Sequence, residues 1–290
     1  ETDSEPEYSY ADYSLATGNM AENLPYFTVN YNAAKSFFEN LTFSIPEFES
    51  KVAQNMVPGS FILKNKLVSF SISIKKEILN VRNVLGIIRG VDTTKTIVIG
   101  AHYDHLGIQN GRTYYGADDN ASGTSGMLAL AKVWKQSNNK PPCNLVFAAW
   151  TGEEIGLFGS EYFVHTLGAN TNQILLYINM DMISRSAPED SLQNQLSIGT
   201  RSQDVQLKQI TNTGNTLLKQ PFQLDLWDVN GYSGSDYASF TAKNIPVMTF
   251  FSGFQTDYHT PRDVYAKVDL KKMTEVLNLV NSALLLFMQQ

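Results

Sequence analysis

Apolar runs of strand length alternate with helical patterns over most of this 290-residue sequence. The runs carry almost no charged residues, and a stretch between two of them has apolar residues at helical spacing, at Met127, Leu130 and Trp134. Strands of this kind are buried on both faces, which is typical of a parallel sheet covered by helices on both sides. We therefore predict an α/β fold with three layers, α/β/α, around a mainly parallel central sheet. The predicted strands are 84–88, 96–102, 144–150, 174–181 and 247–251, and the predicted helices include 159–167 and 235–243.

The first 78 residues do not follow this pattern. Residues 1–30 are acidic and rich in Tyr, and a short helical pattern follows at Ala34, Phe37 and Phe38. Residues 68–74 alternate between apolar residues and Ser, which is the period of a strand with one buried face. We predict an accessory segment over 1–78 and one large domain over 79–290.

Composition excludes several classes of function. The net charge is -6 and no run of Lys or Arg offsets it, so we expect no nucleic-acid partner. No apolar stretch approaches the ~20 residues of a membrane-spanning helix. The sequence begins without Met or a signal sequence, and we expect an exported protein, periplasmic or extracellular, whose signal has been removed. Cys143 is the single cysteine, and it does not distinguish between compartments.

Polar residues follow several of the predicted strands at the point where each strand ends. His102 and Asp104 follow the second strand, Glu153 and Glu154 the third, and Asp181 the fourth. In open α/β sheets, ligands bind outside the carboxyl ends of the strands. We therefore expect these side chains to meet in one crevice.

Two further segments add residues of the same chemical kind. Asp118 and Asp119 lie between a strand and a helix, and His259 lies on the loop before the last helix. Imidazole and carboxylate ligands without thiolate suit zinc or a similar divalent ion. Because the set exceeds what one tetrahedral ion needs, two ions that share a carboxylate fit better.

Each of these residues also has a structural interpretation. Glu153 and Glu154 are compatible with an exposed helix start, where the helix dipole favours acidic side chains. Gly152 and Gly156 on either side instead favour a tight turn that presents both carboxylates.

The same holds for the aspartates and the remaining histidines. Of Asp118 and Asp119, one is expected to cap the following helix and the other to bind. Asp181 ends an apolar strand, where a carboxylate must be paired or bound to metal. His105 and His165 have no matching partner in the sequence, and we interpret both as structural.

Six motifs that appear in a fixed order make the pattern specific. The sequence resembles the zinc-dependent exopeptidase family that contains bacterial leucyl aminopeptidases and glutamate carboxypeptidase, from about Asn83 to the C-terminus. The motifs are G-A-H-Y-D-H-L-G, G-A-D-D-N-A-S-G, T-G-E-E-I-G-L-F-G-S, N-M-D-M-I, G-Y-S-G-S-D-Y-A-S-F and Y-H-T-P-R-D.

The resemblance implies a centre of two zinc ions. His102, Asp119 and Asp181 would hold one ion, and Asp119, Glu154 and His259 would hold the other, so that Asp119 bridges them. It also implies a cis peptide bond directly after Asp119.

The remaining roles follow from the same resemblance. Asp104 is expected to orient the His102 imidazole from the second shell of the centre. Glu153 is expected to act as the general base that takes a proton from the attacking water and returns it to the leaving amine. Tyr232 or Tyr258 would donate a hydrogen bond to the oxyanion, and we take Tyr232 as the first choice.

The resemblance therefore predicts a zinc aminopeptidase that acts on peptides with a free N-terminus. The alternatives are a glutaminyl cyclase, which has the same fold and one zinc, another exopeptidase of this fold, and a non-catalytic receptor that has lost its ligands. No ligand position is lost here. The accessory segment resembles the trailing part of a protease-associated insert. Residue specificity should depend on loops between residues 186 and 230.

Overall fold

The computed structural model describes residues 31–39, 41–55, 62, 67, 78–137 and 139–290. Contacts divide the chain into two compact units, one spanning Ala16–Leu79 and the other including Asn80–Gln290. The first unit contains α1 (Tyr31–Phe38) and α2 (Ile45–Asn55), so the predicted helix near Phe38 is confirmed. The segment 1–30 and the strand predicted at 68–74 lie outside the described residues. Our boundary after residue 78 and the origin of the accessory segment stay predictions.

A local contact explains where α2 begins. The Ser44 amide donates to Glu47 Oε2 at 2.6 Å, and the Glu47 amide donates back to Ser44 Oγ at 3.4 Å. This reciprocal pair is a capping box, which satisfies amide groups that have no partner within the helix.

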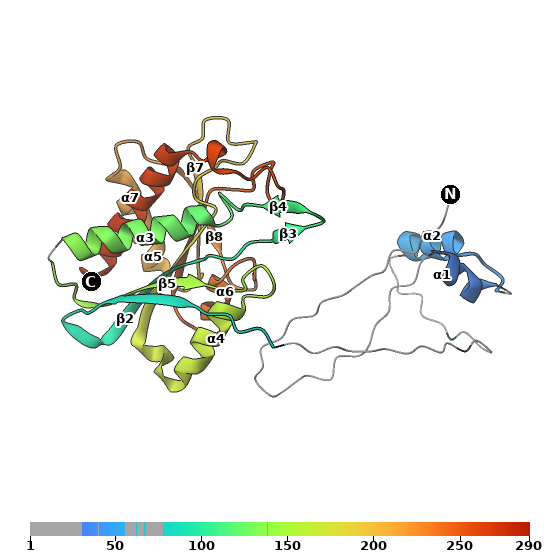
Figure 1. Cartoon of the computed structure of the whole chain (residues 1–290), viewed down its shortest axis with the longest axis horizontal. Helices are drawn as coiled ribbons and strands as arrows, with labels where there is room; N and C mark the ends of the chain where they lie inside the picture. The colour runs from blue at the N-terminus through green and yellow to red at the C-terminus, as the bar shows by residue number, and fades with distance from the viewer. Residues whose placement is uncertain (1–30, 40, 56–61, 63–66, 68–77, 138) are drawn as a thin grey trace. The chain divides into compact units, whose positions relative to one another are not determined.

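A seven-stranded sheet forms the centre of the second unit (Figure 1). Its strand order is β1-β5-β2-β6-β9-β7-β8. Among these described strands, β1 with β5 and β7 with β9 pair antiparallel, whereas the other neighbours pair parallel. The predicted mainly parallel sheet is confirmed. The strands are β1 (Val84–Ile88), β2 (Asp92–His102), β5 (Cys143–Trp150), β6 (Ile174–Asp181), β7 (Gln195–Thr200), β8 (Gln223–Asp228) and β9 (Val247–Phe251).

Helices cover both faces of this sheet (Figure 1). On β2, Ile97 and Ile99 pack in a core with α3 (Ala121–Gln136), α5 (Val205–Thr216) and α7 (Leu270–Phe287). Val98 points to the opposite face and packs in a second core with α4 (Phe158–Leu167) and α6 (Tyr237–Thr241). Successive residues of a strand face opposite sides, so one apolar run fills both cores. The predicted three-layer architecture is confirmed.

Polar contacts inside the second core hold the carboxyl ends of the strands together. Trp150 Nε1 donates to the Tyr177 hydroxyl at 2.9 Å, and this hydroxyl donates to Asn179 Oδ1 at 2.7 Å. A Cβ atom at Gly100 would overlap both the Trp150 and Tyr177 side chains, so glycine is required at this close approach. The ends of β2, β5 and β6, from which the candidate ligands project, are thereby fixed relative to one another.

The segment between residues 186 and 230 differs from our expectation. We treated it as loops, but it contains β7, α5 and β8. The helix predicted at 235–243 is shorter, because residues before Tyr237 form a turn. A hairpin of β3 (Gly107–Gln109) and β4 (Arg112–Tyr114) was not predicted. No described helix combines the length and apolar character needed to cross a membrane.

Candidate metal centre

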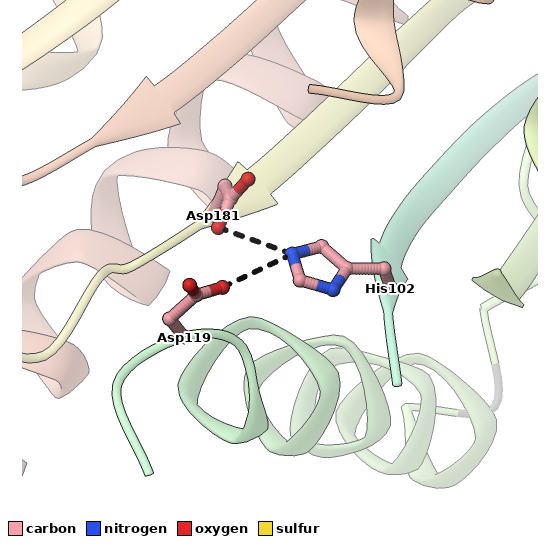
Figure 2. A group of neighbouring side chains, drawn as sticks. All are labelled: His102, Asp119 and Asp181. Carbon is pink, nitrogen blue, oxygen red and sulfur yellow. Dashed lines mark ion pairs between the residues drawn. The ribbon is translucent and has the colours of Figure 1, made fainter. Parts of the chain in front are cut away.

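Two strand ends and one helix start bring His102, Asp181 and Asp119 together. His102 is the last residue of β2 and Asp181 the last of β6, and these strands are neighbours in the sheet. His102 Nε2 lies 3.3 Å from Asp119 Oδ1 and 3.4 Å from Asp181 Oδ1 (Figure 2). The His102 side chain is 1% exposed. His102 and Asp119 are therefore buried, and Asp181 is half-buried beside them.

The turn before α3 fixes Asp119. The peptide bond between Asp119 and Asn120 is cis, as predicted. Asn120 Oδ1 accepts a hydrogen bond from the Gly123 amide at 2.9 Å, and Asn120 Nδ2 donates to the Met180 carbonyl at 3.0 Å. Asn120 therefore caps α3, and the expectation that Asp118 or Asp119 does so is wrong. Neither aspartate side chain is used in the cap, because Asn120 is one residue closer to the helix.

Asp119 also faces a second histidine. His259 Nε2 lies 3.1 Å from Asp119 Oδ2 and 3.1 Å from Glu154 Oε2. Each oxygen of the Asp119 carboxylate therefore faces a different imidazole, since Oδ1 faces His102.

Glu153 and Glu154 lie on a tight turn rather than on an exposed helix start. Gly152 and Gly156 have φ of 68° and 129°, and α4 begins later, at Phe158. The side chains of Glu153 and Glu154 are 12% and 5% exposed. The turn interpretation is confirmed. Both carboxylates are directed into the protein.

Glu153 lies near His102, but farther from its Nε2 atom than Asp119 and Asp181 do. Its Oε2 lies 3.9 Å from His102 Nε2. Burial raises the pKa of Glu153 to about 9, and the neighbouring carboxylates of Asp181 and Asp236 act in the same direction. An acid in these surroundings takes up a proton far more readily than an exposed glutamate does.

Asp104 connects the His102 strand to the glutamate turn. Its Oδ1 accepts a hydrogen bond from the Glu153 amide at 3.2 Å, and its Oδ2 accepts one from the Glu154 amide at 3.3 Å. The closer contact to His102 Nδ1 comes from the Asp104 carbonyl oxygen at 3.1 Å, whereas Asp104 Oδ1 is 3.9 Å away. Asp104 thus lies beside the His102 imidazole, as expected, but its main chain makes the hydrogen-bond-length contact and its side chain fixes the turn.

Asp263 was not among the residues expected at the site, and its carboxylate holds the turn that carries Asp118 and Asp119. Its carboxylate accepts hydrogen bonds from the Asp118 amide at 3.0 and 3.1 Å and from the Asp119 amide at 3.1 Å. Asp118 in turn accepts hydrogen bonds from the amide and hydroxyl of Ser184 at 3.0 and 2.7 Å. Asp118 therefore has a structural contact, and Asp119 is the member of the pair that faces the histidines. Asp263 ends the Y-H-T-P-R-D motif, and that position is the one signal in the sequence for its role.

His105 was interpreted as structural, yet it also lies at this centre. Its Nδ1 is 2.6 Å from Glu154 Oε1. His165 is exposed on α4. The second His of the H-Y-D-H stretch was the sequence signal for His105.

The two candidate tyrosines differ in position. The Tyr258 ring stacks on the His259 ring with centroids 3.8 Å apart. Burial raises the pKa of Tyr258, as do the negative charges of Asp119 and Glu154. Tyr232 is 64% exposed and packs edge-on against Trp227. Tyr258 is therefore the tyrosine that the structure places against a candidate ligand.

The donor set fits divalent cations. Three overlapping groups of side chains have ligand atoms within 4.8 Å of one another, and all of them combine imidazole nitrogen with carboxylate oxygen. Asp181 Oδ1 is buried and forms no hydrogen bond within the described part of the chain. Several buried carboxylates this close together remain charged only if cations compensate them.

Comparison with known proteins agrees with this geometry. Residues 83–284 match the model of peptidase family M28. This chain belongs to peptidase family M28. It is 30% identical to Leucine aminopeptidase 2 of Trichophyton rubrum over 192 residues, which cover 63% of this chain and 35% of that protein. It is 29% identical to Leupeptin-inactivating enzyme 1 of Streptomyces exfoliatus over 165 residues, or 57% of this chain and 34% of that protein. The match thus spans about a third of the length of each relative.

Solved structures of two aminopeptidases and of a cyclase are similar to this chain in fold. An aminopeptidase from Aneurinibacillus sp. strain AM-1 has a TM-score of 0.57 and 26% identity, over 70% of this chain and 47% of that one. BSAP, a zinc aminopeptidase from Bacillus subtilis, has a TM-score of 0.56 and 25% identity, over 70% of this chain and 49% of that one. A glutaminyl cyclase from an Acidobacteriales bacterium shares the fold alone, with a TM-score of 0.60 and 16% identity over 71% of this chain and 73% of that one. The resemblance inferred from the six motifs is confirmed.

Proposed function

We propose that this chain is a zinc-dependent aminopeptidase that removes N-terminal residues from peptides with a free N-terminus. The observation that carries the proposal is the position of Asp119, whose two oxygens face His102 at 3.3 Å and His259 at 3.1 Å. Each of these pairs has a further carboxylate beside it, Asp181 in one case and Glu154 in the other. The names of the relatives in family M28 support the same activity.

Two zinc ions would complete the centre. His102, Asp119 and Asp181 would hold one ion, and Asp119, Glu154 and His259 would hold the other. When bound, zinc polarises a substrate carbonyl and lowers the pKa of water.

The chain itself would supply the proton transfer. Glu153 makes none of the shortest contacts to the histidines, so its carboxylate, ionised once bound cations compensate the neighbouring negative charges, stays available. It would take a proton from the attacking water on an Oε atom and deliver it to the amine nitrogen that leaves. The Tyr258 hydroxyl, beside His259, would donate a hydrogen bond to the oxygen on which negative charge develops. Tyr232 is the second candidate for this donor.

The number of bound zinc ions would separate this proposal from a glutaminyl cyclase. The cyclase predicted as the alternative uses one zinc, whereas the ligands proposed here would form two groups that share Asp119. Likeness of fold does not distinguish the two activities. Export of the protein and a role for the accessory segment stay predictions.

The adjacent residues Glu153 and Glu154 provide the test, because each serves as the control for the other. Zinc content is measured by elemental analysis, and kinetics with a panel of aminoacyl chromogenic substrates. The wild type should bind two zinc ions and release the N-terminal residue. Glu153→Gln should keep both ions and show little change in KM, while kcat falls by about 10²–10⁴. Glu154→Gln should lose one ion and recover part of its activity in excess zinc.

Two outcomes would contradict the proposal. A wild type that binds at most one zinc ion would favour the cyclase. Loss of zinc from Glu153→Gln, with full zinc content in Glu154→Gln, would show that the two glutamates have exchanged roles.

A further inference from the structure

His105 is a largely enclosed side chain at the centre that the proposed mechanism does not use. It follows His102 by three positions and its side chain is 9% exposed. Its Nδ1 lies 2.6 Å from Glu154 Oε1 and 3.8 Å from Asp119 Oδ2. It therefore contacts one proposed zinc ligand directly and lies beside another.

The contact divides the two oxygens of Glu154 between two histidines. Oε1 meets His105, whereas Oε2 lies 3.1 Å from His259 Nε2. An ionised carboxylate has no proton to give, so Nδ1 of His105 must be the donor in this hydrogen bond. Oε2 alone then remains directed to the position between Asp119 and His259.

The surroundings of His105 keep its ring in this orientation. A Cβ atom at Gly116 would overlap the His105 ring, and Gly116 has φ of +60°, which favours glycine. On another side the ring lies edge-on to that of His259, with centroids 5.8 Å apart. Rotating the ring away from Glu154 would require these neighbours to move.

We propose that His105 is a positioning residue that makes Glu154 a one-oxygen ligand. The proposal rests on the proposed function, because it concerns the ion assigned to Asp119, Glu154 and His259. By holding Oε1, the Nδ1–H group stops the carboxylate from turning to offer both oxygens. Hydrogen bonds of this kind to a ligating side chain orient it, and their loss typically weakens metal binding 10–100-fold.

The experiment measures zinc affinity, so it does not depend on turnover. Metal-free protein is titrated with zinc against a chromophoric chelator for the wild type and three variants. His105→Leu removes the donor and keeps much of the bulk. His105→Asn places an amide nitrogen on Cγ, where the imidazole has Nδ1, and so keeps a donor. His165→Leu removes an exposed histidine from α4 and is the matched control.

We expect His105→Leu to weaken one of the two zinc ions about 10–100-fold and to leave the other unchanged. His105→Asn should restore most of that affinity, and His165→Leu should match the wild type. Thermal unfolding of each metal-free variant confirms that it is folded.

Wild-type affinity for both ions in His105→Leu would overturn the proposal. So would equal weakening in the Leu and Asn variants, which would indicate that Nδ1 itself binds the metal or that the ring acts by its bulk. If the wild type already bound fewer than two ions, the proposed function would fail with it, and this result is separate from any difference between variants.

Discussion

The two histidines proposed to hold zinc lie in opposite surroundings. His102 ends a central strand, opposite Trp150 in the neighbouring strand, and its side chain is 1% exposed. His259 lies on the loop after β9 with φ of +53°, and its side chain is 36% exposed. Packing of the sheet places the first histidine, whereas the second depends on contacts made by its own loop. Core packing alone therefore explains the position of His102 but not that of His259.

Carboxylates provide those loop contacts. Asp257 accepts hydrogen bonds from Lys267 Nζ at 2.7 Å, Arg262 Nε at 2.8 Å and Arg185 Nη2 at 2.9 Å. The contact with Lys267, together with the two arginines, holds the pKa of Asp257 well below its usual range. Asp263 then joins the loop to the amide groups of Asp118 and Asp119. Contacts of Asp257 and Asp263, one on each side of His259, thus hold the loop in place.

Replacing each histidine in turn should give the largest difference between the two halves. In zinc-free protein, His102→Ala leaves the buried carboxylates of Asp119 and Asp181 without their imidazole, and should lower the free energy of unfolding by about 3–5 kcal/mol. His259→Ala removes a partly exposed partner and should cost less than about 1 kcal/mol. Urea unfolding after chelation of the metal measures both. Equal losses would show that the strand end and the loop contribute alike.

The two candidate tyrosines differ in their contact with the loop that carries His259. Because Tyr258 stacks on His259, Tyr258→Phe should lower kcat about 10²–10³-fold, the usual loss when one oxyanion donor is removed. Tyr232→Phe, at the exposed position, should leave kcat close to the wild type. Steady-state kinetics on both variants decides between them. The reverse order would restore Tyr232, the first choice from the sequence.

Asp263 tests whether the loop that carries His259 is held to the turn that carries Asp119. Asp263→Ala leaves the buried amides of Asp118 and Asp119 without their acceptor, and should lower the free energy of unfolding by about 2 kcal/mol and weaken zinc binding. Asp269→Ala is the matched control, because Asp269 caps α7 through the Lys271 and Lys272 amides and its loss should cost about 1 kcal/mol. Zinc titration should separate the two variants. Weaker zinc binding in both would mean that lower stability alone accounts for the effect.

The smallest effect is expected from Arg262. Its side chain is 64% exposed, and Asp257 keeps Arg185 and Lys267 as partners when it is removed. Arg262→Gln should therefore lower the free energy of unfolding by less than about 1 kcal/mol, and less still at high salt. Chemical unfolding at two salt concentrations measures this. A larger loss that persists in salt would place Arg262 among the essential contacts of the loop.

The strands that present the ligands could be predicted because their signals are local. The bounds of β6 and β9 match the predicted 174–181 and 247–251, since each is a buried apolar run. β8 reads Q-L-D-L-W-D and is the last strand at one side of the sheet, where polar residues interrupt the apolar pattern. For that reason β8 was not recognised.

The parts of the centre that were missed depend on contacts between distant segments. His105 meets Glu154 across 49 positions, and Asp263 meets Asp118 across 145. No periodicity or spacing in the sequence reports such a pair. His102, Asp119, Glu154, Asp181 and His259 could be proposed from motif order, whereas the residues that orient them became visible with the fold.

The place of β9 in the sheet bears on how the protein is made. β9 is the last strand in the sequence, yet it lies between β6 and β7 in the middle of the sheet. A growing chain that has not yet released β9 from the ribosome has no strand to join the β1-β5-β2-β6 half to the β7-β8 pair. His259 follows β9 and emerges later still. The complete centre therefore cannot assemble on a nascent chain until synthesis has passed both β9 and His259.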